Sequence, residues 1–225
     1  FGAANSARKQ LIESIGNALS YAITPALSKE AKTVERFELL KVFYEEVEAA
    51  FFVIPAFVYF VPINEDNAAT VEKIIRKSLQ GRDAREVSYA AIALQKWIEL
   101  SEVTSSLQLS NLISRLIVII ESGRAVGLHQ LLLVAGELFK KEQLSKEQVA
   151  SLIDAIPNAF YAADYANIEP NSREAISASS IREACVKLAN LLVSKHPAPV
   201  LLDLLNKSQE DALPEVRFAI ELHES

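Results

Sequence analysis

Apolar residues recur every three or four positions along most of the chain, with polar residues between them. This spacing places the apolar side chains on one face of an α-helix. The two clearest segments are residues 109–120 and 128–139, where apolar positions follow one another at 0, 3, 4 and 7. The same pattern predicts further helices over residues 3–23, 29–50, 71–79, 84–98, 149–156, 181–193 and 200–205.

Capping and helix-breaking residues set the expected ends of these helices. Ser145 and Gln148 fit a capping box, in which the serine oxygen accepts an amide hydrogen and the glutamine reaches back. Ser180 and Glu183 predict a second box. Pro157 is expected to close or bend its helix. Further boundaries are expected at Pro25, Gly81, Gly123 and Pro214.

The most apolar run covers residues 49–63 and contains Pro55 and Pro62. It is shorter than the roughly 20 residues that cross a bilayer, so no membrane span is predicted. A helix buried on all sides and kinked at Pro55 is favoured over an exposed binding or dimer surface.

Four helix starts begin with a β-branched residue, and in three of them small or apolar residues follow at positions 3 and 4; the start at Val126 departs, with His129 at position 3. They are Val87, Val126, Ile181 and Val216, spaced about 39, 55 and 35 residues apart. An insertion at about 157–177 explains the longest interval. Each start follows a shorter apolar helix and a tight link, so the repeated unit is helix, turn, helix.

These starts resemble those of the HEAT-repeat (armadillo-like) superfamily, whose second helix opens with an acidic or proline turn and Val-Arg. Pro-Glu-Val-Arg-Phe-Ala at 214–219 matches best, Ser-Ile-Arg-Glu-Ala at 180–184 and Arg-Glu-Val-Ser-Tyr-Ala-Ala at 85–91 match less, and 123–130 departs. The resemblance implies an all-α, right-handed α-α superhelix of stacked antiparallel helix pairs.

One solenoid domain over residues 1–225 is therefore expected. HEAT-like repeats would fill residues 67–225, after irregular N-terminal helices over 1–66.

Composition agrees with an all-α chain that has a large core. Half of the 225 residues are hydrophobic, and only six are Gly and eight Pro. The 23 basic residues against 29 acidic ones give a net charge of −6, so nucleic acid is an unlikely partner.

Cys185 is the only cysteine and lies on an apolar stripe, which predicts a buried thiol and a reducing, cytoplasmic or other intracellular compartment. The chain has no Met, so it is either processed or a segment of a longer protein, and no signal peptide is recognised.

No residue pattern indicates catalysis, a cofactor or a metal. His129, His196 and His223 lack metal-ligand spacing, and no phosphate-binding glycine loop or nucleophile motif occurs. Arg85, Arg182 and Arg217 stand at three of the links. They are better explained by pairing with nearby carboxylates and carbonyls than by a ladder for anionic ligands.

The expected function is a non-catalytic scaffold or adaptor that binds a protein or peptide along its surface. Two alternatives stay open: a regulatory helical segment of a larger protein, and an enzyme resembling HEAT-like alkylpurine DNA glycosylases. For the enzyme, Trp97 with Glu99, or the group at 161–165, would supply the aromatic and carboxylate. The candidate contacts for a protein partner are Lys96, Glu99, Tyr161, Asp164, Tyr165, Lys187 and Asn190.

Overall fold

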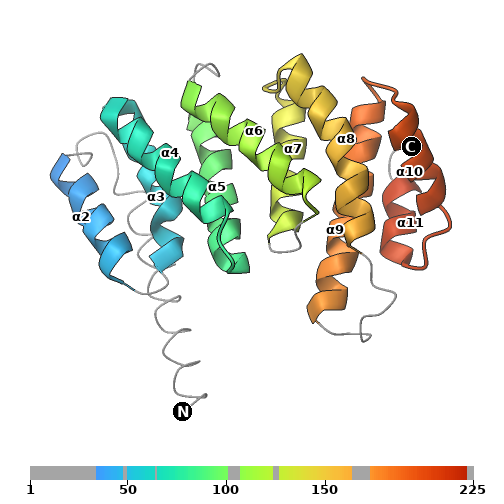
Figure 1. The fold of residues 1–225 in the computed structure, drawn as a ribbon, viewed down its shortest axis with the longest axis horizontal. Helices are drawn as coiled ribbons and strands as arrows, with labels where there is room; N and C mark the ends of the chain where they lie inside the picture. Colours follow the sequence, from blue (N-terminus) through green and yellow to red (C-terminus); the bar gives the residue numbers. More distant parts are fainter. Residues whose placement is uncertain are drawn as a thin grey trace, which may run out of the picture. The chain divides into compact units, whose positions relative to one another are not determined.

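The computed structural model describes residues 34–47, 50–63, 65–100, 107–123, 127–163 and 173–221. Over these ranges the chain is all-α, with ten α-helices, two 3₁₀ helices and no strand (Figure 1). None of these helices is both long enough and apolar enough to cross a membrane. The chain divides into two compact units, unit 1 from Phe1 to Leu112 and unit 2 from Ile113 to Ser225. The expectation of one solenoid domain stays a prediction.

Unit 1 contains a central apolar segment and the helices around it. Its elements are α2 (Val34–Glu46), η2 (Ala50–Val53), α3 (Ile54–Phe57), η3 (Val58–Ile63), α4 (Glu65–Leu79) and α5 (Ala84–Leu100). Helix α6 (Leu107–Glu121) crosses the boundary. Unit 2 continues with α7 (Leu128–Lys140), α8 (Lys146–Ala162), α9 (Arg173–Val193), α10 (Pro199–Ser208) and α11 (Pro214–Glu221).

The apolar run of unit 1 is buried, as predicted, but it is not one kinked helix. It forms η2, α3 and η3 in succession. Pro55 lies in the first turn of α3, where its missing N–H costs nothing. Ile54 and Phe57 are fully buried. The rings of Phe37 and Tyr44 on α2 meet Phe57 edge-on at 5.7 and 5.9 Å.

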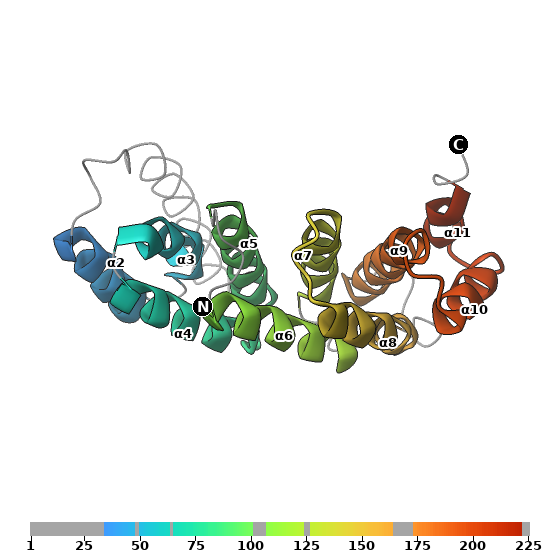
Figure 2. The ribbon, with the colours of Figure 1, turned by 90° about the horizontal axis from the view of Figure 1, so that it is seen from above.

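The second helices of unit 2 form a row in which α9 packs against both α7 and α11 (Figures 1 and 2). Residues near the start of α7 contact the middle of α9, and residues near the end of α7 contact the segment just after α9. His129 is close to Lys187, and the ring of Phe139, further along α7, lies 5.8 Å from that of His196, just beyond α9. Two helices whose contacts advance together run parallel.

The first helices of unit 2 form a second row. Gln148 at the start of α8 donates to the Ser114 hydroxyl of α6 at 3.2 Å. At the other end, a Cβ added to Gly123 would clash with Ala162 of α8. These contacts also advance together, so α6 and α8 run parallel, and α10 packs beside α8. Helix α8 packs against α9 and α10 against α11, which joins the two rows.

Several predicted boundaries and core residues are confirmed. The Ser145–Gln148 capping box is complete, with its two hydrogen bonds at 3.2 and 2.9 Å. Gly123 follows α6 with φ +65°, and Pro214 opens α11. At the two C-terminal starts, the apolar positions Ile181, Ala184, Cys185, Val216 and Ala219 are buried, while Ile220 is half-buried.

Two expectations about helix ends need correction. Pro157 does not close its helix: α8 continues past it to Ala162, because burial of Ala159 and Phe160 in the last turn offsets the roughly 3 kcal/mol that an interior proline costs. The capping box at Ser180 is wrong, because α9 begins at Arg173 and Ser180 lies inside the helix. Residues 157–162 and 173–177 of the expected insertion are therefore helical. The helix predicted over residues 3–23 and the start at Val126 lie outside the described residues.

Candidate interaction surface

Five of the seven predicted contact residues lie in the described ranges, on three helices. Lys96 and Glu99 belong to α5 of unit 1, Tyr161 to α8, and Lys187 and Asn190 to α9 of unit 2. Asp164 and Tyr165 lie outside the described residues. The structure therefore provides two groups, one for each unit.

In unit 1, Lys96 and Glu99 form an ion pair on the outer face of α5. Their charged atoms are 3.1 Å apart, and both side chains are more than a third exposed. The hydrogen bond to Glu99 raises the pKa of Lys96. Ile92 and Leu100 on the same helix are 41% and 40% exposed, so this face offers apolar surface beside an internally balanced charge pair.

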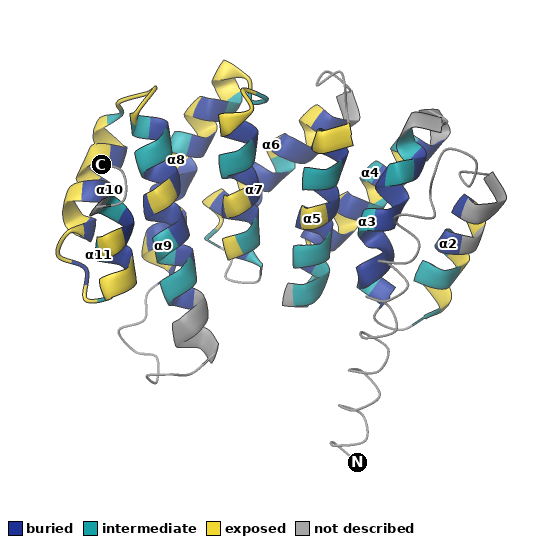
Figure 3. Ribbon diagram, turned by 180° about the vertical axis from the view of Figure 1, so that it is seen from behind, coloured by how far each residue is buried: buried dark blue, intermediate teal, exposed yellow. Residues whose placement is uncertain are grey.

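In unit 2, Lys187 of α9 is exposed. Figure 3 shows exposed and half-buried positions along α7 and α9. The ammonium group of Lys187 pairs with Glu183 at 2.6 Å. His129 of α7 is close to both residues. Burial lowers its pKa, while Glu183 and Lys187 act on it in opposite directions. Leu133, one turn further along α7, is 42% exposed.

Asn190 has a structural contact of its own. Its side-chain amide donates to the carbonyl oxygen of Ala219 at 3.2 Å, and the residue is half-buried. This bond connects α9 to α11. A partner that used the Asn190 amide would have to compete with it.

Tyr161 is half-exposed at the end of α8, at 50%. Its ring meets that of Phe160 at 5.4 Å and nearly a right angle. The ammonium group of Lys207 on α10 lies 5.9 Å from the Tyr161 ring centroid and pairs with Asp203 at 2.8 Å. Hydrogen bonding to Asp203, followed by Tyr161, raises the pKa of Lys207. The exposed Tyr161 ring therefore contacts side chains of both α8 and α10.

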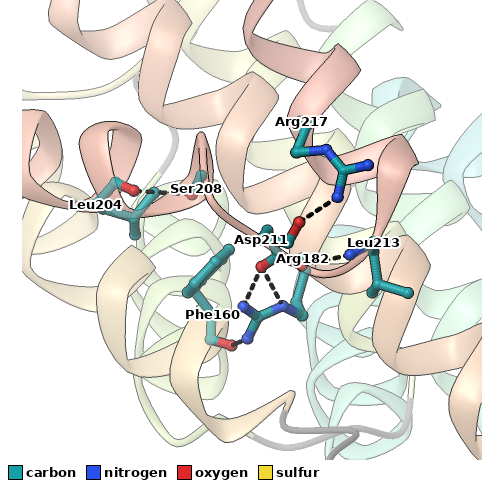
Figure 4. A network of polar contacts seen from close by, with 7 residues as sticks. All are labelled: Phe160, Arg182, Leu204, Ser208, Asp211, Leu213 and Arg217. Atoms are coloured by element: carbon teal, nitrogen blue, oxygen red, sulfur yellow. Dashed lines mark hydrogen bonds and ion pairs between the residues drawn. The ribbon is translucent and has the colours of Figure 1, made fainter.

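The most buried ion pair among the described residues joins Arg182 and Asp211, close to Phe160 (Figure 4). Arg182 of α9 donates from Nε and Nη2 to one carboxylate oxygen of Asp211, the Nε contact measuring 3.1 Å. The two side chains are only 13% and 2% exposed. The other carboxylate oxygen of Asp211 accepts the Leu213 amide at 3.0 Å, and Arg217 donates to the Asp211 carbonyl.

The three link arginines are paired within the chain, which confirms the favoured interpretation. Arg85 donates to Asp83 at 2.9 Å, and Arg182 and Arg217 both bind Asp211. An anion that bound these arginines would have to displace those contacts.

Two of the residues considered for catalytic chemistry, Trp97 and Cys185, are buried in the described part of the chain. Trp97 is 2% exposed and Glu99 pairs with Lys96, so this pair lacks the accessible aromatic ring that the glycosylase alternative needs. Cys185 is fully buried as predicted, and burial raises the pKa of its thiol far above the usual range. Within the described ranges no three His, Cys, Asp or Glu residues are grouped to hold a metal ion.

Sequence inspection missed the apolar residues on the exposed faces. Leu133 and Phe218 are 42% and 58% exposed. A signal was present for Leu133, because it stands off the stripe of Leu131, Leu132 and Ala135 that packs inward.

Comparison of the chain with models of protein families, with curated proteins and with solved structures found no match in any of the three.

Proposed function

We propose that the chain is a non-catalytic interaction scaffold or adaptor that binds a protein or peptide. The proposed fold is a HEAT-like right-handed superhelix of stacked antiparallel helix pairs. The observation that carries the proposal is the pair of rows in unit 2, with α7 and α9 parallel in one and α6 and α8 parallel in the other. Stacked helix pairs of this kind leave one row of helices free along its outer side, and such surfaces commonly bind extended partners.

The proposed contact face of unit 2 is the outer side of α7 and α9. Lys187 and Leu133 are both exposed there, as is His129 of α7, which is close to Lys187. The ion pair between Lys187 and Glu183 leaves this face with little net charge. A partner would therefore gain more from covering Leu133 than from long-range electrostatic attraction.

Affinity capture followed by mass spectrometry tests this function when a face variant is compared with a matched control. The face variant is Leu133→Asp with Lys187→Glu. The control makes the same two changes on the other row, Val118→Asp with Lys146→Glu, at positions that are also exposed. A protein retained by the wild type and the control but lost from the face variant, with equal helicity by circular dichroism, supports the proposal. Equal retention by both variants contradicts the proposed face.

A further inference from the structure

A continuous chain of contacts leads from the α10–α11 link through Asp211 and Arg182 to Phe160 (Figure 4), and Phe160 in turn contacts Tyr161 at the surface. Arg182 binds the Asp211 carboxylate with Nε and Nη2. Its remaining nitrogen, Nη1, donates to the Phe160 carbonyl at 3.2 Å, and its guanidinium carbon lies 3.8 Å from the centre of the Phe160 ring. One guanidinium group therefore holds both the link and the end of α8.

The Phe160 carbonyl is in the last turn of α8, where carbonyls have no partner within the helix. Arginine side chains stabilise helix ends by donating to such carbonyls. Tyr161 is in that same turn, directly after Phe160. The conformation of the Tyr161 backbone therefore depends on a turn that Arg182 closes.

Side-chain packing connects the same residues. The Phe160 ring is 2% exposed and lies between the Arg182 guanidinium and the Tyr161 ring. On its other side, Tyr161 contacts Lys207 of α10. The α10–α11 pair thus reaches Tyr161 directly through Lys207 and indirectly through Asp211 and Arg182.

We propose that the Asp211–Arg182 ion pair couples the position of Tyr161 to the docking of the α10–α11 pair. A partner that binds Tyr161 would stabilise the docked pair, and loosening of the pair would weaken binding by the same factor. Arg182 and Asp211 are positioning residues in this device. Partner binding at Tyr161 rests on the proposed function, whereas the coupling between Tyr161 and the α10–α11 pair requires no partner.

The experiment follows Tyr161 directly in the full chain. 3-Fluorotyrosine is introduced at position 161 alone, and its fluorine NMR signal is compared in Asp211→Asn and Asp154→Asn. Asp154 is an exposed carboxylate on α8 and forms no ion pair in the described part of the chain, so it controls for the loss of one charge. The expected result is a shifted and broadened signal in Asp211→Asn and an unchanged one in Asp154→Asn.

Arg182→Lys provides a second variant that decides the question if Asp211→Asn does not fold. A lysine keeps the positive charge beside Asp211, but as a single point donor it cannot also hold the Phe160 carbonyl and cover its ring. The fluorine signal of Tyr161 is again expected to move. A signal that coincides with that of Asp154→Asn in the folded variant overturns the coupling. That failure would leave the α7–α9 face untouched, since the capture experiment does not alter Asp211, Arg182 or Tyr161.

Discussion

The links α4–α5 and α10–α11 use the same turn in two different settings. In the first, Oδ1 of Asp83 accepts the amide hydrogen of Arg85 at 2.8 Å. In the second, Oδ1 of Asp211 accepts that of Leu213 at 3.0 Å. Both aspartates accept the backbone amide two residues ahead, but Asp83 directly precedes α5, whereas the bond from Leu213 to Asp211 lies wholly in the link before α11.

The two aspartates differ in the arginine they pair with. Asp83 pairs with Arg85, two residues away, and both side chains are more than a third exposed. Asp211 pairs with Arg182, which is 29 residues away, and its own side chain is 2% exposed. The first pair is a local feature of one turn. The second pair connects α9 to the α10–α11 link. We therefore expect it to contribute more to the free energy of unfolding than the first pair does.

The largest expected effect is that of Asp211→Asn. Asparagine keeps an oxygen for the Leu213 amide but leaves the buried Arg182 guanidinium without its counter-charge. Breaking a buried pair from one side typically costs about 3–5 kcal/mol. Urea unfolding followed by circular dichroism should show a loss of this size. A loss below about 1 kcal/mol would mean that the Asp211 pair is no stronger than an exposed one.

The next largest loss of unfolding free energy is expected from substitution of a glycine at one of two links. Gly123 has φ +65°, and an added Cβ would clash with the fixed Cβ of Ala162. Gly123→Ala should therefore cost about 1–3 kcal/mol for the backbone conformation alone. An added Cβ at Gly81 would meet the movable carboxylate of Glu86 and, at 2.9 Å, the Ser78 carbonyl oxygen, but Gly81 has no positive φ and so lacks the backbone cost. Gly81→Ala should cost less in the same urea experiment, and the reverse order would contradict the close approach of α6 and α8.

Asp83→Asn should have a small effect. The turn hydrogen bond to the Arg85 amide is retained, and only an exposed ion pair is lost. Exposed pairs contribute about 0.2–1 kcal/mol and are screened by salt. The difference in unfolding free energy between wild type and Asp83→Asn should thus shrink from low to 1 M salt. A difference that salt does not change would indicate that the pair is shielded from solvent.

Acid should produce the smallest change in stability. Whether it stabilises or destabilises the wild type relative to Asp83→Asn follows from the Asp83 pKa. The Arg85 side chain, which donates to the carboxylate, lowers the pKa of Asp83 below its usual value. A depressed folded-state pKa contributes stability above the unfolded-state value of about 4, and this is lost as pH falls through the folded-state pKa. The stability advantage of wild type over Asp83→Asn should be constant from pH 7 to 5 and decline below 4. An advantage that grows on acidification would reverse the assigned shift.

Helical periodicity predicted most of the fold because each helix buries one regular stripe. The stripes at 109–120 and 128–139 became α6 and α7 with almost the expected ends. The prediction of helix ends failed where tertiary packing overrides a capping or helix-breaking residue. Pro157 is a local stop that the packing of Phe160 overrides, and Ser180 matches a capping box inside a longer helix.

The candidate surface was less predictable than the fold. Exposure of Lys187 followed from its position beside the apolar stripe of its helix, whereas Tyr161 was assigned to an insertion and instead lies exposed in the last turn of α8. The burial of Asp211 did not, since its partner Arg182 is distant in sequence and no local pattern connects them. Asn190 was expected to face outward and instead binds Ala219, because α11 packs over that side of α9.

The central claim is that the buried ion pair between Arg182 and Asp211 stabilises the packing of α9 against the α10–α11 link. A pair of double-mutant cycles tests it most directly. One cycle combines Arg182→Met with Asp211→Asn, and the other combines Arg85→Met with Asp83→Asn. Each yields the coupling free energy of one pair from urea unfolding. The predicted result is a coupling several times larger for Arg182 and Asp211 than for Arg85 and Asp83. Equal couplings would contradict the claim.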